Sequence, residues 1–306
     1  MTAAAPALGI RRTNLARHAF GAMGTDVVLL VDREGSGHPG AAFGTVEAEF
    51  HRLEGLFSRF REDSELAILN RDGVIVASAE LLDVVELAIA ARDRTGGRFD
   101  PTVHDALVAA GYDRSFETLP PETEDAAGLE GAPCEGRVVV DRTRGVIELE
   151  PGFRLDLGGV AKGYAVDRVV FRLSETGPCV VNAGGDLAVR GLLGSGPWPV
   201  GVETPGGMIT LALSHGAMAT SGRNRRRWRR AGEERHHLID PSTGRPSRTD
   251  LVQVTVIAAS AVEAEIQAKS LLLAGEEHAL REAEEIGMPC VLVTADGRAL
   301  RAGGLA

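Results

Sequence analysis

The chain has 306 residues, of which 44% are hydrophobic and 25% are charged, and its formal net charge is −10. This composition is typical of a soluble globular protein with enough residues for a substantial core. The acidic balance argues against a general nucleic-acid binder, because the neutralisation of phosphates requires positive surface. No uninterrupted apolar run approaches the length of a membrane-spanning helix, so we expect no membrane partner.

The cysteines and the N-terminal segment both favour a cytoplasmic protein. Cys134, Cys179 and Cys290 are scattered without the spacing of a metal site or a disulfide framework, which suits reduced thiols. The arginine pair near the N-terminus is not followed by a clean apolar stretch, so no signal peptide is indicated. We therefore predict a disordered lead-in over residues 1–15 and a single domain over residues 16–306.

Apolar spacing and turn residues predict a mixture of helices and strands. Residues 41–57 carry apolar side chains at helical spacing, and residues 79–94 form an amphipathic stretch that ends at glycines. Ser260 and Glu263 have the spacing of a capping box at the start of a late helix. In chain order we predict a strand interrupted by a turn (18–32), two helices (41–57, 79–94), a hairpin (138–150), a strand and helix (154–170), two strands (179–192), short strands (198–220), a strand (251–258), two helices (261–273, 276–286) and a hairpin (289–301).

This order predicts an α+β fold, with a mixed or antiparallel sheet core and packed helices. The elements do not alternate as regular strand–helix–strand units, and no repeat recurs at a period of about 20–50 residues. Residues 112–135 are the loosest segment, where we expect a surface excursion. The arginine-rich segment 223–230 is predicted to be a loop.

A predicted strand and helix meet at Asp156-Leu-Gly-Gly-Val-Ala-Lys-Gly163. This segment lacks the GK[ST] ending of a Walker A loop and is not a GxGxxG motif. It could be a corner in which the two glycines only relieve crowding. Alternatively, its backbone N–H groups, the helix N-terminus and Lys162 could form a cradle for an anionic ligand.

Three further polar corners follow. They are Asn182-Ala-Gly-Gly-Asp186, Ala219-Thr-Ser-Gly222 and His237-Leu-Ile-Asp-Pro-Ser-Thr-Gly-Arg-Pro246. Each consists of residue types that favour turns by themselves. Four such corners in one chain are harder to explain as turns alone.

These corners, together with other short segments, resemble the FAD:protein FMN transferase family (ApbE-like). No single segment is decisive, but the ordered set is specific and covers residues 18–295. The matching segments are Met23-Gly24-Thr25; Phe57-Ser-Arg-Phe60 through Ser64-Glu65 to Leu69-Asn70; Gly97-Arg-Phe-Asp-Pro-Thr-Val103; Asp156 to Asp167; Asn182 to Leu187; Ala219 to Gly222; and His237 to Pro246.

The resemblance implies an enzyme that cleaves the pyrophosphate of FAD with a divalent ion, usually Mg²⁺. It would attach the FMN half to a Ser or Thr hydroxyl of a target flavoprotein and release AMP. Some relatives hydrolyse FAD to FMN and AMP instead. The implied fold is a single α+β unit, with FAD in a cleft between the sheet core and helices.

The resemblance also implies roles for individual residues. Lys162 would lie near the pyrophosphate, and His237 would be the base for the acceptor hydroxyl, with Asp240 beside it. A histidine with an ordinary pKa of about 6.5 suits that task. The FAD contacts would comprise Met23, Phe60 and Phe99 at the flavin or adenine, Asp186 and Thr220 as polar contacts, and Asp100, Gly158, Gly159, Lys162, Ser221, His237 and Ile239.

The sequence departs from the family pattern at the implied metal site. The family metal is held by the carbonyl that corresponds to Ala161, and by an Asp and a Thr four residues apart on a late helix. Here Glu265 replaces the Asp and Lys269 replaces the Thr, which removes an oxygen ligand that Mg²⁺ favours. The two residues could be an ordinary helical ion pair worth about 0.2–0.5 kcal/mol. Alternatively, the Lys269 ammonium could stand where the metal would, paired with Glu265 and facing a phosphate.

Two smaller departures concern aromatic residues. Phe60 stands where Tyr is common, which keeps a stacking surface and loses a hydroxyl. Asn224 replaces an aromatic residue, while Arg226 matches a family arginine. The arginine-rich segment 223–230, which includes Trp228, could be a solvated loop, a docking surface for an acidic protein or a site for single-stranded nucleic acid. The net charge disfavours the last, so we expect no nucleic-acid partner.

Three functions therefore follow from the sequence. The first is FMN transfer from FAD to an acceptor protein, with altered metal dependence. The second is FAD or FMN binding with weak or no transfer, because the metal site is altered. The third is an FAD pyrophosphatase, in which water replaces the protein hydroxyl.

Overall fold

The computed structural model describes residues 14–33, 39–124 and 131–305. Most of the lead-in predicted over residues 1–15 lies outside these ranges, as does part of the excursion predicted over residues 112–135. Strand β1 begins at Leu15, so the last residue of the predicted lead-in belongs to a strand. Within the described ranges, no helix combines the length and the apolar character that crossing a membrane requires.

A large antiparallel sheet forms the centre of the molecule. Among the described residues, eight strands pair in the order β1-β2-β7-β8-β11-β16-β17-β18, and every neighbouring pair is antiparallel. The predicted α+β class with an antiparallel sheet core is therefore confirmed. The strands are β1 (Leu15–Ala22), β2 (Thr25–Asp32), β7 (Cys179–Ala183), β8 (Asp186–Arg190), β11 (His215–Gly222), β16 (Leu251–Ala258), β17 (Cys290–Thr294) and β18 (Ala299–Ala302).

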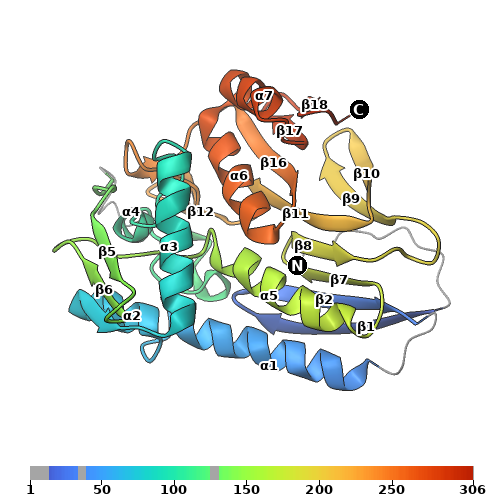
Figure 1. Ribbon diagram of the computed structural model, residues 1–306. Coiled ribbons are helices and arrows are strands. Elements are labelled where there is room, and N and C mark those ends of the chain that lie inside the picture. The colour runs from blue at the N-terminus through green and yellow to red at the C-terminus, as the bar shows by residue number, and fades with distance from the viewer. Residues whose placement is uncertain (1–13, 34–38, 125–130, 306) are drawn as a thin grey trace.

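Helices α1 (Gly40–Phe57), α5 (Ala161–Ser174) and α6 (Ala261–Ala274) cover one face of this sheet, as Figure 1 shows. The largest hydrophobic core lies between these helices and the sheet, and it extends to α3 (Ala79–Arg94). Helix α7 (Glu276–Glu285) packs against α6 and the strands at one edge of the sheet. Because α5 and α6 contact each other, side chains from the two helices can meet at one site.

The opposite face is covered by the hairpin of β9 (Trp198–Thr204) and β10 (Gly207–Leu213). Trp198 is fully buried there, and its indole N–H donates to the carbonyl of Gly191 at 3.0 Å. Burial of a large aromatic ring with a satisfied donor makes this hairpin a fixed part of the core.

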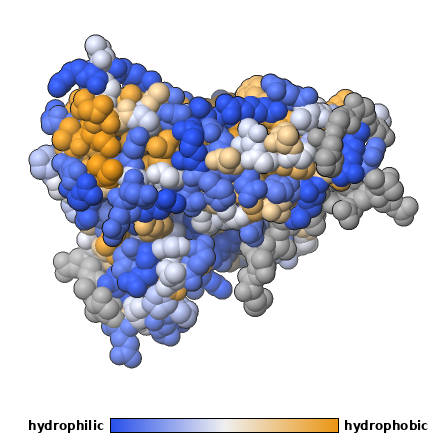
Figure 2. Space-filling view, turned by 90° about the horizontal axis from the view of Figure 1, so that it is seen from below, coloured by the Kyte–Doolittle hydropathy of each residue, from blue (hydrophilic) through white to orange (hydrophobic). Residues whose placement is uncertain are grey.

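Smaller elements extend the molecule beyond the sheet. Helix α2 (Glu65–Asp72) adjoins a three-stranded sheet of β3 (Val74–Val76), β6 (Val146–Leu149) and β5 (Val138–Asp141). Val74, Val76 and Val139 of that sheet are exposed. Figure 2 shows an apolar area at the end of the molecule where Figure 1 places β5 and β6.

The segment predicted as an arginine-rich loop is partly a strand. Strand β12 (Arg227–Arg230) pairs with β13 (Glu233–His236), and also in parallel with β4 (Glu122–Thr123). Trp228 is only 4% exposed, and its indole N–H donates to the carbonyl of Ala110 at 2.8 Å. Its ring is therefore a core residue and does not present a stacking face to nucleic acid.

Trp228 belongs to a smaller hydrophobic core. This core contains Tyr112, Trp228 and Ile239 together with residues of α4 (His104–Ala109), and the remaining elements lie near it. A short 3-10 helix (Phe116–Thr118) and the pair β14 (Ile239–Asp240) and β15 (Arg245–Pro246) complete the described elements.

Candidate functional site

A cleft with two lobes lies among α5, α6 and the ends of the central strands. The first lobe has a volume of about 270 Å³ and is lined largely by aromatic and aliphatic side chains. The second has a volume of about 730 Å³ and is lined by polar and small residues of β2, β8 and β11. The two lobes share eleven lining residues, among them the carboxylates Glu54 and Glu117. Five of the eleven form what we call the shared wall: Gly158, Lys162, Arg226, His237 and Lys269.

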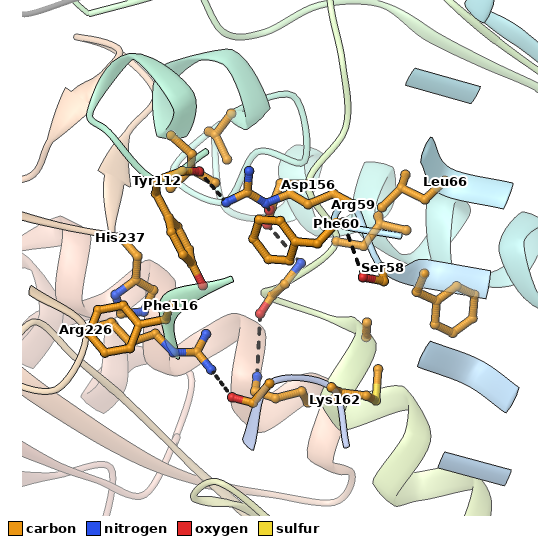
Figure 3. A pocket seen from close by; sticks show the side chains of 18 of the residues that line it. Ser58, Arg59, Phe60, Leu66, Tyr112, Phe116, Asp156, Lys162, Arg226 and His237 are labelled. Carbon is orange, nitrogen blue, oxygen red and sulfur yellow. Dashed lines mark hydrogen bonds and ion pairs between the residues drawn. The ribbon is translucent and has the colours of Figure 1, made fainter. Parts of the chain in front are cut away.

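Arg59 organises the first lobe, as Figure 3 shows. Its guanidinium lies 4.2 Å from the ring centre of Phe60 and 4.6 Å from that of Tyr112. Its Nε forms an ion pair with Asp156 Oδ2 at 2.8 Å, and Nη2 donates to the Tyr112 carbonyl at 2.7 Å. Burial by itself would raise the pKa of Asp156, but the positive charges of Arg59 and Lys269 lower it below its ordinary value. Asp156 therefore stays ionised and holds Arg59 between the two rings.

The corner before α5 brings backbone and side chain close together. The Gly158 N–H donates to Asp156 Oδ1 at 2.9 Å, and α5 begins at Ala161. A Cβ at Gly159 would collide with the Lys269 ammonium and come within 3.0 Å of the Phe99 ring. The absence of a side chain at Gly159 therefore creates the space in which Lys269 lies.

Lys162 lies between two carboxylates. Its ammonium is 2.7 Å from Asp186 Oδ2 and forms a short ion pair with Glu265 Oε1. The other oxygen of Glu265 accepts the N–H of Gly163 at 2.9 Å. Burial, together with the negative charge of Asp186, raises the pKa of Glu265 to about 7, even though Lys162 opposes this shift. The two carboxylates hold Lys162 in its charged form, because they raise its pKa against the effect of burial.

Lys269 lies one helical turn after Glu265 and has a different environment. Its ammonium lies 5.4 Å from the centre of the Phe99 ring. Within the described part of the chain, no hydrogen bond or ion pair is made by this ammonium. Burial lowers its pKa, and Glu265 and Asp156 oppose that shift from a distance. Lys162 and Lys269 are the only two lysines among the 306 residues, and both lie at the shared wall.

His237 faces both lobes from the opposite side (Figure 3). Burial lowers its pKa well below the ordinary value, and the charges of Arg226 and Lys269 act in the same direction. The imidazole is therefore neutral near pH 7. Its Nδ1 is buried and has no hydrogen-bond partner among the residues that the structure describes. A neutral imidazole that lines a cleft can accept a proton from a bound group.

Comparison with known proteins shows the family to which this chain belongs. The model of the ApbE family matches residues 23–292. This chain belongs to the ApbE family. It is 36% identical over 213 residues to an FAD:protein FMN transferase of Rhodobacter capsulatus, a match that covers 67% of this chain and 40% of that relative's length.

A second relative and a solved structure extend the likeness over most of the chain. An FAD:protein FMN transferase of Vibrio cholerae is 31% identical over 277 residues, which cover 83% of this chain and 81% of the relative. The crystal structure of the ApbE protein of Thermotoga maritima superposes with a TM-score of 0.81 at 27% identity. That match covers 94% of this chain and 97% of the other, so the fold is that of the ApbE family.

The cleft gathers most of the residues that the family resemblance assigns to FAD. The first lobe contains Met23, Phe60, Asp100 and Ile239, and the second contains Asp186, Thr220 and Ser221. Phe99 and Gly159 lie behind the surface of the cleft and act through Lys269, which they contact. Asp100 uses its carboxylate locally, because it accepts from the Thr102 N–H at 2.8 Å and the Glu135 N–H at 2.6 Å.

Asp240 does not line either lobe, although it follows His237 closely in the chain. Its Oδ1 accepts from the N–H of Ser242 at 3.0 Å and from the hydroxyl of the same residue at 2.7 Å. The carboxylate thus stabilises the turn after β14. The structure brings His237 and Lys162 to the cleft and directs the Asp240 carboxylate to this turn.

The residues that the ApbE resemblance assigns to magnesium do not fit that ion. One carboxylate oxygen of Glu265 pairs with Lys162, and the other accepts the backbone N–H of Gly163. Lys269 brings an ammonium where an oxygen ligand would be needed, and Mg²⁺ requires six oxygen ligands in near-octahedral geometry. Among the described residues, no cluster of three or more His, Cys, Asp or Glu side chains could hold a metal ion. Ala161 lines the first lobe, but Glu265 and Lys269 do not complete a metal site with it.

Sequence reasoning missed several residues that shape the cleft. Arg59 was visible only as part of a matching segment, with no role assigned to it. Tyr112 and Phe116 lie in the segment predicted as a surface excursion, yet both line the first lobe. Tyr112 is 7% exposed, and its ring packs 5.6 Å from that of Trp228. The two aromatic residues in a loose, polar segment were the signal that could have indicated a buried wall.

Proposed function

We propose that this chain transfers the FMN half of FAD to a Ser or Thr hydroxyl of an acceptor flavoprotein and releases AMP. The observation that carries the proposal is the pair of lobes that meet at a shared wall of cations around a neutral histidine. FAD consists of two ring systems joined by a pyrophosphate. One ring system can lie in each lobe, while the pyrophosphate lies at the shared wall.

The residues of this chain account for the chemistry of such a transfer. The acceptor oxygen attacks the phosphorus of the FMN half, the bond from that phosphorus to the bridging oxygen breaks, and AMP leaves with that oxygen. His237 accepts the proton of the attacking hydroxyl, because its imidazole is neutral and lines both lobes. Phosphoryl transfer depends mainly on positioning and on charge stabilisation, which Arg226 and Lys269 supply at the shared wall.

A second candidate is a protein that binds FAD without efficient transfer. It is favoured by one observation: Glu265 is occupied by Lys162 and Gly163, so the divalent ion implied by the family has no complete site. In that case the purified protein would retain flavin absorbance and would show no turnover.

One experiment separates these functions. The protein is incubated with FAD and a flavoprotein that carries an acceptor hydroxyl, either in EDTA or with Mg²⁺. AMP is measured by chromatography and the acceptor by intact mass. Transfer yields AMP together with an acceptor heavier by the mass of the FMN group. Free FMN and AMP without an adduct would identify a pyrophosphatase, and no AMP under either condition would refute the proposed transferase.

A substitution of His237 tests its role as the base. His237→Gln keeps a polar side chain of similar size but removes the basic nitrogen. It should lower the rate of transfer by about 10²–10⁴-fold, the usual contribution of a general base. FAD binding, measured separately, should change much less.

A further inference from the structure

We propose that the Lys269 ammonium is a built-in cation for the pyrophosphate of FAD, so that this chain binds FAD without a divalent ion. This inference rests on the proposed function, because it concerns the same ligand in the same cleft. It goes beyond that function by assigning to a side chain the charge that relatives are expected to take from a metal.

The first support is the difference between the two lysines. Lys162 pairs with Asp186 at 2.7 Å and with Glu265, so its positive charge is neutralised by carboxylates of the protein itself. Lys269 has no carboxylate within ion-pair distance among the described residues, and it lines both lobes of the cleft. At the shared wall, the positive charge left to meet an anionic ligand is therefore that of Lys269, together with Arg226.

The second support is the space prepared for this side chain. Gly159 lacks the Cβ that would collide with the Lys269 ammonium, and the Phe99 ring lies 5.4 Å below it. A cation over an aromatic face is stabilised even when it has no anionic partner. The ammonium is thus held against the Gly158–Gly159 backbone, at the point where the two lobes meet.

The third support is the state of Glu265. A carboxylate that served a metal would present free oxygens to the cleft. Both oxygens of Glu265 are instead used within the protein, one by Lys162 and one by the Gly163 N–H at 2.9 Å. Lys269 follows Glu265 by one helical turn, so these two positions together replace a pair of oxygen ligands with an internal ion pair and a free ammonium.

The test measures FAD binding by titration calorimetry, with no acceptor present and no turnover required. The wild-type protein should bind FAD with the same affinity in EDTA and in Mg²⁺. Lys269→Met keeps most of the length of the side chain and removes the charge. It should weaken FAD binding by about 10- to 100-fold, as expected for the loss of one charge-assisted contact, and Mg²⁺ should not restore the affinity.

Arg94→Met is the matched control. Arg94, the last residue of α3, pairs with Glu263 of α6 at 3.1 Å, and neither residue lines the cleft. The variant therefore removes one positive charge away from the cleft. It should leave FAD affinity unchanged. In a second variant, Glu265→Asp is combined with Lys269→Thr, which should make FAD binding at least about 10-fold tighter with Mg²⁺ than in EDTA.

The outcomes separate this inference from the proposed function. If the wild-type protein binds no FAD under either condition, the proposed function itself fails. If it binds FAD at least about 10-fold more tightly with Mg²⁺, the built-in cation is wrong and the proposed function stands. Unchanged affinity in Lys269→Met, or a double variant that gains no dependence on Mg²⁺, would also overturn the inference.

Discussion

The contact between α5 and α6 at Gly163 determines whether the two halves of the site meet. A Cβ at Gly163 would lie 2.7 Å from the N of Val262 and 2.8 Å from both the C and the O of Ala261. These are backbone atoms, which cannot rotate away as a side chain could. Helix α6 also cannot retreat easily, because Asp167 of α5 accepts the N–H groups of Ala261 and Val262 at 2.7 and 2.9 Å. We therefore predict that Gly163→Ala destabilises the protein and disturbs the cleft.

The magnitude follows from three opposing effects. Overpacking of a tight contact costs about 1–3 kcal/mol. Weakening the hydrogen bond from Gly163 to Glu265, a bond to a charged group, costs about 1 kcal/mol more. Alanine gains about 1 kcal/mol over glycine in a helix interior. The net expectation is a loss of about 1–3 kcal/mol in the free energy of unfolding.

Urea denaturation of the variant and of a matched control measures this loss. Gly44 lies in α1, and a Cβ added there would have no neighbouring atom within 4 Å, so Gly44→Ala should raise stability by about 0.5–1 kcal/mol. The same substitution thus has opposite signs at the two sites. If Gly163→Ala were as stable as the wild-type protein, or more so, the reasoning that the helices cannot separate would be refuted.

Three further predictions concern charged groups. Hydrogen bonds from Arg52 and Arg168 lower the pKa of Glu49 from 4.5 to about 2. Because the folded-state pKa lies below the unfolded one, the stabilisation is complete above pH 4.5 and is lost as the pH falls toward 2. Glu49→Gln should lower the free energy of unfolding by about 1–2 kcal/mol at pH 7, a value that allows for the partly exposed arginines. In denaturation curves at falling pH, the difference in stability between variant and wild type should shrink, and a constant difference would contradict this prediction. The His237 imidazole should titrate with a midpoint well below the ordinary 6.5 in ¹⁵N NMR experiments, because burial lowers its pKa, and a midpoint at or above 6.5 would show that the cleft does not desolvate it. Arg59→Met should lower the free energy of unfolding by about 3–5 kcal/mol, since it leaves a buried carboxylate unpaired, and a urea-measured loss below about 1 kcal/mol would speak against that ion pair.

Local patterns predicted the elements that have strong periodicity and clear ends. The helix predicted over residues 79–94 and the strand predicted over residues 251–258 have those bounds in the structure. Ser260 accepts the N–H of Glu263 at 3.2 Å, as expected for a helix cap. Periodicity and capping act between residues a few positions apart, so the sequence contains them directly.

Local patterns failed where distant residues determine the structure. Residues 112–135 were expected to form a surface excursion, but Tyr112 is held between Arg59 and Trp228. Likewise, the arginine-rich segment is partly a strand because Trp228 is buried against the carbonyl of Ala110. Composition suggested exposure in both segments, whereas packing across more than a hundred residues decided burial.

The sequence alone determined the family, the fold class and the four polar corners, because glycines, turn residues and amphipathic spacing are local properties. It also showed that Glu265 and Lys269 stand where oxygen ligands were expected, but it led us to expect the two to pair with each other. The tertiary structure corrects that expectation. Glu265 pairs with Lys162, 103 positions away, and Lys269 lies in the space left by Gly159. Which of two neighbouring charges is neutralised depends on distances that exist only after α5 and α6 have packed together.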